Sequence, residues 1–330
     1  MRLRVLAAAA LLVAALPHAA SAADHGSYTK HSFTNAKGTL SYTLYLPPAG
    51  GTTPRNLVVV LPGAGETSDG AMTRSNFNKV AEKLRFAVAY PEQSVAYNSG
   101  QEWDWATASK EGRTNREASI IAGLTRYVTS RVKLDPKHVY VMGISAGAGM
   151  ASAMAVTYPD IYSGLGIEAG CPFDNAGCGG GSVTADQSAA AVIKAMGRYH
   201  HHLPVFNEYG NADPIAAGVS SNLVIPSWLT VDDLLDNGKN DGSVSRSASV
   251  SRVVTPAAPN KPYREQVYRD SRGCGLGVNW VVYGEQHAWS GGTPTDSSDV
   301  SADPLAPDAS TAMYRFWTSP HTLNANSSCS

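Results

Sequence analysis

Five short apolar runs recur along the chain, and they constrain its fold more than any other feature. They read LVVVL at 57–61, FAVAY at 86–90, VYVM at 139–142, VFNEY at 205–209 and NWVVY at 279–283. Strands that are apolar on almost every position belong in a sheet covered on both faces. Helical patterns fall between these runs. The sequence therefore predicts an α/β fold with a doubly wound, mostly parallel sheet and helices on both faces.

Two further segments give clear local predictions. Residues 39–47 alternate apolar and polar side chains, which predicts a half-buried strand joined through a turn at 35–38 to an earlier strand at 31–34. Residues 114–132 have helical periodicity, and Thr114 with Glu117 fits the pattern of a capping box. The positions expected to share the apolar face of this helix are Ile120, Ile121, Leu124, Tyr127 and Val128.

The chain of 330 residues is 43% hydrophobic and 16% charged, which suffices for one large domain. Residues 1–22 contain two arginines, an apolar run and a closing Ala-Ser-Ala, the pattern of a secretory signal peptide. The apolar run at 5–16 is shorter than the roughly 20 residues that span a bilayer. We expect residues 23–330 to form a single domain without a separate binding module. The polar stretch 232–262 is interpreted as an excursion with a mobile tip.

The charge pattern excludes some partners. Removal of residues 1–22 takes away Arg2 and Arg4 and lowers the formal net charge from −1 to −3. No basic block remains, so neither nucleic acid nor an anionic membrane is an expected partner.

An even number of cysteines in an exported chain favours disulfides. We predict that Cys171 pairs with Cys178 across a short loop and that Cys274 pairs with Cys329. The spacing does not fit a zinc site, and the histidines at 200–202 have no carboxylates at ligand spacing. They are interpreted as a solvated helix end, so no metal site is expected.

A serine stands where the third apolar run becomes a helical pattern. Residues 143–147 read GISAG, which matches the G-x-S-x-G nucleophile elbow. The sharp strand-to-helix turn of such an elbow leaves almost no room for side chains two residues on either side of the serine. The small residues Ala148, Gly149, Ala151 and Ala153 then allow the helix to approach the sheet closely. Ser145 is thus the candidate nucleophile.

A serine nucleophile needs a base, and the base needs an orienting acid. Asp213 follows the run at 205–209, and His287 follows the run at 279–283. Both should lie at the carboxyl edge of the sheet, in the chain order Ser, Asp, His. The rival acids, which fall in a stretch predicted to be helical and solvated, are Asp232, Asp233 and Asp236.

An oxyanion hole requires two backbone N–H groups. The amide of Ala146 follows the serine directly, and the glycine-rich loop at 62–70 can supply the second. Gly63 and Gly65 allow close approach of the backbone, which makes Ala64 the candidate donor, although a neighbouring amide would serve equally well.

Together these motifs resemble the esterase family of extracellular poly(3-hydroxybutyrate) depolymerases and the related feruloyl and acetylxylan esterases, which have the α/β-hydrolase fold. The similar stretches, in the family's order, are 57–70, 86–93, 101–106, 134–164, 210–214, 284–292 and 303–317. The resemblance implies that Ser145, Asp213 and His287 form a catalytic triad, with oxyanion amides from Ala64 and Ala146. Two departures lie beside the site. Pro62-Gly63 replaces the usual His-Gly, and residues 208–210 read EYG where a plainer His-Gly is common.

Three tryptophans are candidates for substrate binding. Trp103 and Trp105 alternate in the stretch EWDWA, and Trp289 lies two residues after His287. Flat apolar rings suit a polyester backbone or a phenolic acyl group. The alternative is that some of these rings only fill the core.

The sequence thus predicts a secreted serine carboxylic-ester hydrolase, extracellular or periplasmic, that needs neither metal nor cofactor. The leading substrate is a short-chain polyhydroxyalkanoate polyester or its oligomers. Feruloyl or acetyl esters of plant polysaccharide come next, and a polyamide is a more distant substrate for the same triad. A non-catalytic secreted binding protein is the alternative from another class.

Overall fold

The computed structural model describes residues 25–48, 55–174, 183–219 and 223–329. Residues 1–22, for which we predict a signal peptide, and Cys178 lie outside this part of the chain.

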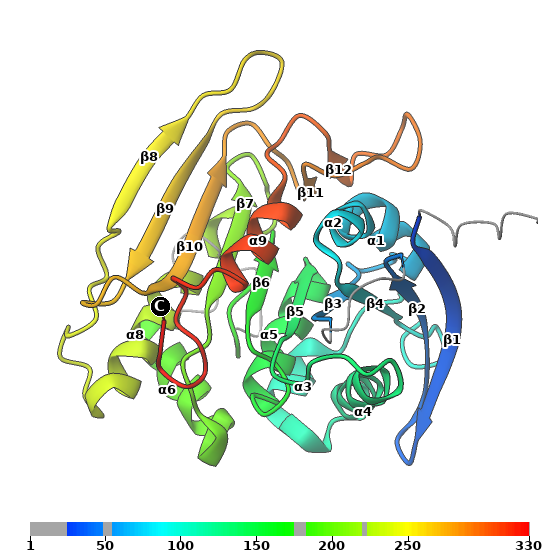
Figure 1. The fold of residues 1–330 in the computed structure, drawn as a ribbon, viewed down its shortest axis with the longest axis horizontal. Helices are drawn as coiled ribbons and strands as arrows, with labels where there is room; N and C mark the ends of the chain where they lie inside the picture. Colours follow the sequence, from blue (N-terminus) through cyan, green and yellow to red (C-terminus); the bar gives the residue numbers. More distant parts are fainter. Residues whose placement is uncertain (1–24, 49–54, 175–182, 220–222, 330) are drawn as a thin grey trace, which may run out of the picture.

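One large sheet crosses the molecule (Figure 1), and within the described residues it has ten strands in the order β1-β2-β4-β3-β5-β6-β7-β10-β9-β8. The six central strands, from β4 to β10 in this order, run parallel to one another. At one end β2 pairs antiparallel with β4 and β1 pairs antiparallel with β2, and at the other end β9 pairs antiparallel with β10 and β8 pairs antiparallel with β9. The strands are β1 (Ser27–Asn35), β2 (Gly38–Leu46), β3 (Leu57–Leu61), β4 (Ala87–Glu92), β5 (Val139–Ile144), β6 (Leu165–Glu168), β7 (Val205–Gly210), β8 (Val250–Val254), β9 (Tyr263–Arg269) and β10 (Gly275–Val282). Parallel neighbours bring their carboxyl ends to one edge, where loops from distant parts of the chain meet.

Helices cover both faces of this sheet (Figure 1), as the sequence predicts. They are α1 (Ser68–Ser75), α2 (Phe77–Leu84), α3 (Trp105–Glu111), α4 (Arg116–Arg131), α5 (Ala146–Thr157), α6 (Ala185–Met196), α7 (Ala217–Val219), α8 (Ile225–Asn237) and α9 (Ala309–Trp317), with 3₁₀ turns η1 (Gly112–Thr114) and η2 (Gly197–Tyr199). A small parallel pair, β11 (Trp289–Ser290) and β12 (Ala302–Asp303), lies beside the main sheet.

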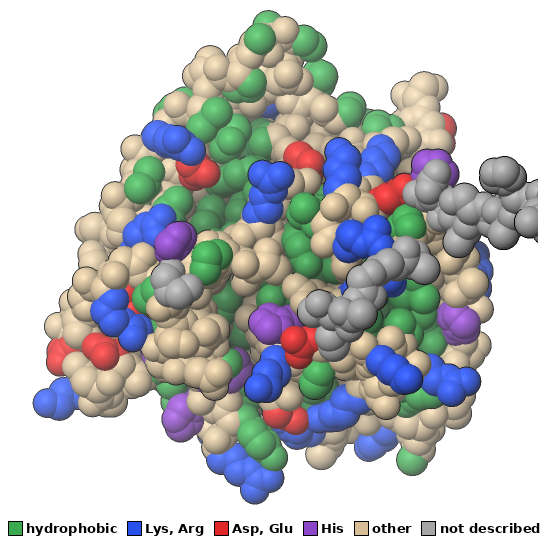
Figure 2. Space-filling model, viewed as in Figure 1, with side chains coloured by type: hydrophobic (Ala, Val, Ile, Leu, Met, Phe, Trp, Pro, Cys, Tyr) green, Lys and Arg blue, Asp and Glu red, His purple; other side chains and the backbone are tan. Residues whose placement is uncertain are grey.

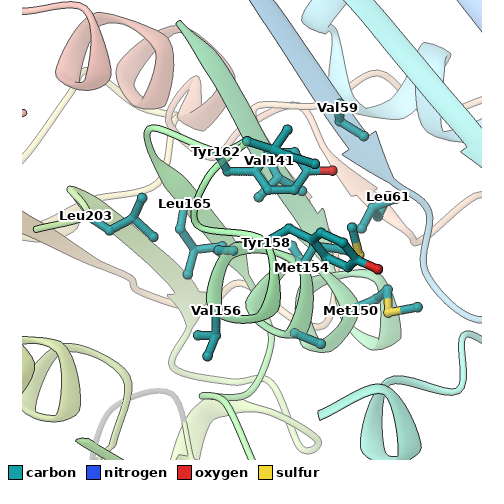
Figure 3. Packing of buried hydrophobic residues seen from close by; sticks show 14 of the residues in the cluster. Val59, Leu61, Val141, Met150, Met154, Val156, Tyr158, Tyr162, Leu165 and Leu203 are labelled. Carbon is teal, nitrogen blue, oxygen red and sulfur yellow. The ribbon is translucent and has the colours of Figure 1, made fainter. Parts of the chain in front are cut away.

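Each face of the sheet has its own apolar core. Leu57, Val59 and Leu61 of β3 join a core with α3, α4, α5, α6 and α8, while Val58 and Val60 join a second core with α1, α2 and α9. Figure 3 shows the first core around α5, a helix that is buried along its whole length. Continuous apolar strands therefore serve two cores at once, which explains why their sequences do not alternate.

The helix predicted at 114–132 forms as α4, but its start differs from the prediction. The N-cap is Asn115, whose side chain accepts from the Ala118 amide at 3.1 Å, and no capping box forms. Glu117 is buried instead and accepts from the Asp104 amide at 2.8 Å. Tyr127 is also misassigned, because 48% of it is exposed while it packs on Phe33 of β1. Tertiary contacts have overridden the local pattern at both positions.

Parts of the polar stretch 232–262 have regular secondary structure. It completes α8 and forms β8, which pairs antiparallel with β9 and extends the sheet beyond its parallel centre. Strand β6 in the sequence GLGIEAG was not predicted either.

Two more findings bear on the setting of the domain. Cys274 and Cys329 form the predicted disulfide. Among the described helices, none combines the length and apolar character needed to cross a bilayer.

Candidate active site

Ser145 lies at the turn from β5 into α5 and has φ 56° and ψ −124°, a strained conformation for a residue with a side chain. The turn is crowded on both sides. A Cβ on Gly143 would lie 2.4 Å from the Gly147 carbonyl carbon, and one on Gly147 would lie 2.1 Å from the Leu61 oxygen. Only glycine fits at these two positions, so the local sequence builds the elbow that it predicts.

Asp213 and His287 meet at the same edge of the sheet, after the paired parallel strands β7 and β10. His287 Nδ1 lies 2.8 Å from Asp213 Oδ2. The other oxygen of Asp213 accepts from the amides of Ile215 and Ala216 at 2.7 and 3.0 Å. Burial opposes ionisation of Asp213, but these three hydrogen bonds outweigh it and hold its pKa below the ordinary value. The arrangement fixes an ionised carboxylate behind the histidine ring.

One pocket of about 370 Å³ is lined by both the candidate nucleophile and the candidate base. Its lining is formed by Gly63, Ala64, Gly65, Glu66, Arg74, Ile144, Ser145, Ile215, His287, Trp289 and Ser301. Asp213 lies behind His287, out of this lining. A small acyl group held here would contact the serine and the histidine together.

Glu66 ties the loop after β3 to the rest of the site. Its Oε2 accepts from the Gly63 amide at 2.9 Å, while its Oε1 accepts from Trp289 Nε1 and Arg74 Nη1, both at 3.1 Å. Arg74 also donates to Asp299 at 2.7 Å. Burial raises the pKa of Glu66, although the hydrogen bonds from these donors act to lower it. No sequence motif pointed to this residue.

The two amides predicted for an oxyanion hole have different neighbours. Ala64 is exposed to the pocket, whereas Ala146 adjoins Ser145 at the first position of α5. Within the described residues neither N–H donates to another protein group. The nearby Gly63 amide is occupied by Glu66, which favours Ala64 over its neighbour. Both free amides can therefore bind an incoming oxygen.

The tryptophan predictions need correction. Trp103 is 2% exposed and donates through Nε1 to the Pro62 oxygen at 2.9 Å, and Trp289 is 1% exposed and bonded to Glu66. Trp289 reaches the pocket wall, but neither ring offers an open surface because the loops pack over both. Trp105 is half-buried against Gly149 of α5 and lines a separate pocket of about 580 Å³.

Two of the three rival carboxylates, Asp232 and Asp233, are buried, contrary to prediction, whereas Asp236 is exposed as predicted. Asp232 is buried and accepts from His202 Nδ1 at 2.8 Å, so the histidine run is partly packed as well. Asp233 is buried and caps the turn at 242–244. Across the described residues no cluster of three or more His, Cys, Asp or Glu side chains is placed to hold a metal ion.

Three further carboxyl groups, which the sequence analysis missed, lie beneath the site. Glu168, Glu208 and Glu285 are 1%, 0% and 0% exposed. For Glu168 and Glu208 the available signal was a lone glutamate within an apolar strand, in GLGIEAG and VFNEYG, whereas Glu285 lies in the loop after β10 and had no such signal.

Solved structures with a similar backbone identify the fold. An acetyl xylan esterase from Aspergillus awamori superposes with a TM-score of 0.58 at 19% identity, covering 78% of this chain and 94% of the esterase. A feruloyl esterase module from Clostridium thermocellum gives 0.50 at 15% identity, with 81% and 83% coverage. The protein has the α/β-hydrolase fold.

The family follows from the sequence comparison. The family model described as Esterase PHB depolymerase matches residues 40–238, and the chain belongs to this family. It is 27% identical over 311 residues to a poly(3-hydroxybutyrate) depolymerase of Ralstonia pickettii, covering 89% of this chain and 62% of that protein. It is 29% identical over 258 residues to poly(3-hydroxyalkanoate) depolymerase C of Paucimonas lemoignei, covering 76% and 58%. The chain thus spans about three fifths of the length of these relatives.

Proposed function

We propose that this protein is a secreted serine carboxylic-ester hydrolase with Ser145, His287 and Asp213 as its catalytic triad. The observation that carries the proposal is the pocket where the strained serine and the histidine meet, with an ionised aspartate hydrogen-bonded behind the ring.

In the proposed reaction Ser145 attacks the ester carbonyl while His287 takes the hydroxyl proton. Asp213 holds the imidazole so that Nε2 faces the serine, and the Ala64 and Ala146 amides bind the oxyanion. His287 then protonates the leaving alcohol. Water, deprotonated by the same histidine, releases the acid and restores the serine. These steps use only the chain's own residues.

For the substrate we propose a short-chain polyhydroxyalkanoate or its oligomers. Two relatives are depolymerases of such polyesters and match most of this chain. The pocket volume suits one small acyl unit, and exposed Ile215 adds an apolar wall for it. Acetylated xylan is the second candidate, because a probable acetylxylan esterase A from Aspergillus fumigatus is 30% identical over 179 residues, covering 49% of this chain and 46% of that protein.

Export is part of the proposal. The signal-like residues 1–22 and the Cys274–Cys329 disulfide both favour an oxidising compartment, extracellular or periplasmic.

The test compares Ser145→Ala and His287→Ala with the wild-type chain on p-nitrophenyl acetate, polyhydroxybutyrate film, methyl ferulate, acetylated xylan and a polyamide. Because triad members act as a unit, each variant should lose a similar factor, on the order of 10⁴ or more in rate. Circular dichroism checks that both variants are folded. Wild-type turnover by either folded variant refutes the triad. A fluorophosphonate that fails to label Ser145 favours the non-catalytic binding protein.

A further inference from the structure

Glu168, the last residue of β6, contacts both halves of the proposed machinery. Its backbone oxygen accepts from the Ser145 amide at 3.1 Å, at the turn that carries the nucleophile. Its carboxyl oxygen Oε1 accepts from the amide of Ser290, three residues after His287. One residue thus links the serine turn to the histidine loop.

Glu208 and Glu285 complete a cluster around this carboxyl group. Glu208 is the register partner of Glu168 on the neighbouring strand β7, and its side chain lies within hydrogen-bonding range of Glu285. The backbone oxygen of Glu285 accepts from the Ala212 amide at 3.1 Å, next to Asp213. The cluster therefore adjoins the loops of all three proposed triad residues.

The carboxyl groups of this cluster have too few donors to be ionised together. Among the described residues, no donor reaches Oε2 of Glu168, and the carboxyl groups of Glu208 and Glu285 have only each other and the Ser290 side chain within hydrogen-bonding range. A pair of carboxylates can bond only if one of them keeps a proton. Charged carboxylates buried without partners are strongly disfavoured, so the cluster must hold protons.

The acidic neighbours act in the same direction. The acidic groups that face the cluster from other elements are Glu66, Asp213, Asp303 and Asp308, and the basic one is Lys261, which is already paired with Asp303. Burial, reinforced by these neighbours, raises the pKa of Glu168 and Glu208 well above the ordinary value. Burial raises the pKa of Glu285 to about 7.

We propose that Glu168 is a positioning residue that acts as a neutral carboxylic acid, holding the Ser145 turn and the His287 loop in register while Glu208 and Glu285 share the remaining protons. This inference rests on the proposed function. It follows that alkaline pH, by ionising Glu285 first, places an unpaired charge beneath the site and loosens the two loops.

The experiment compares Glu168→Ala with Glu168→Gln on p-nitrophenyl acetate from pH 5 to pH 9. The alanine lacks the acceptor for the Ser290 amide, and a small misplacement of catalytic groups lowers rates by about 10- to 100-fold. We expect that loss in kcat at pH 6, with KM changed less than about threefold. The glutamine keeps the acceptor without a titrating proton, so it should restore most of kcat.

The pH profile separates positioning from mere packing. Glu285→Gln cannot ionise and should move the alkaline limb of kcat upward by about one pH unit or more. Glu117 is the matched control, a buried glutamate that also accepts a backbone amide but contacts none of the triad loops. Glu117→Ala should lower the melting temperature and leave the pH profile unchanged.

Three results would overturn the proposal. The first is wild-type kcat in folded Glu168→Ala, and the second is an alkaline limb that Glu285→Gln does not move. The third is a Glu168→Ala loss that simply parallels the melting temperature, as in Glu117→Ala. If Glu168→Ala does not fold, the pH profiles of Glu168→Gln and Glu285→Gln test the proposal instead. Ser145→Ala, measured in the same assay, keeps the two proposals apart, because activity in that variant refutes the proposed function itself.

Discussion

Glu66 offers the sharpest test of how the loop after β3 is held. In Glu66→Ala the Gly63 amide and the Trp289 indole N–H, both buried, lose their acceptor. Each orphaned donor costs about 1–3 kcal/mol. Arg74 keeps its bond to Asp299 and adds little. Relief of the desolvation that raises the pKa of Glu66 offsets part of the loss. We therefore expect the free energy of unfolding to fall by about 2–4 kcal/mol.

Activity should fall as well, because the freed loop no longer presents the Ala64 amide at a fixed place. Loss of one oxyanion donor lowers kcat by about 10²- to 10³-fold, which sets the upper limit of the effect. Glu66→Gln keeps one acceptor oxygen but turns an NH₂ group toward the remaining donors, so its losses should be intermediate.

The assay is urea unfolding together with kcat on p-nitrophenyl acetate for wild type and both variants. Asp236→Ala is the control, because this carboxylate is exposed at the end of α8 and does not line the pocket. It should leave both quantities unchanged. Unfolding of Glu66→Ala at the wild-type urea concentration, or unchanged kcat, would show that the three hydrogen bonds do not hold the loop.

Two other predictions follow from packing and from the disulfide. Trp103→Ala should lower the free energy of unfolding by about 3–5 kcal/mol and reduce turnover of polymer and small ester together. Trp105→Ala should reduce turnover of the polymer alone if this ring contacts the polymer chain. Turnover of both substrates and the melting temperature of each variant distinguish these outcomes. Cys274→Ser opens a disulfide that spans 55 residues and should destabilise by roughly 4 kcal/mol in urea unfolding, and non-reducing peptide mapping should join Cys274 to Cys329.

The strands and the candidate site were predictable where a local sequence pattern reflects a structural requirement. The apolar runs mark buried strands, and parallel strands deliver whatever follows them to one edge. Ser145, Asp213 and His287 each follow such a run, and the structure places Ser145 and His287 in the lining of one pocket, with Asp213 hydrogen-bonded to His287. The glycines two residues before and after Ser145 also predicted the sharp turn, because their positions have no room for a Cβ.

Side-chain direction was not predictable in this way. Trp103 and Trp289 flank the site in sequence, but packing of the loops turns both rings inward to the acceptors at Pro62 and Glu66. Glu117 fits a capping box locally, yet its carboxyl group reaches the Asp104 amide across the fold. Such choices depend on partners that are distant along the chain, which a local pattern does not contain.

The carboxyl groups beneath the pocket show how hydrogen bonding sorts similar groups into different roles. Asp213 receives three hydrogen bonds, from His287 and two amides, and these keep its charge directed at the imidazole. Glu208, five residues earlier and fully buried, receives no such donors within the described structure, and its pKa is raised well above the ordinary value. If both were ionised, their repulsion would oppose the aspartate that the proposed reaction needs. A neutral cluster beside an ionised aspartate therefore leaves one negative charge in place behind the histidine.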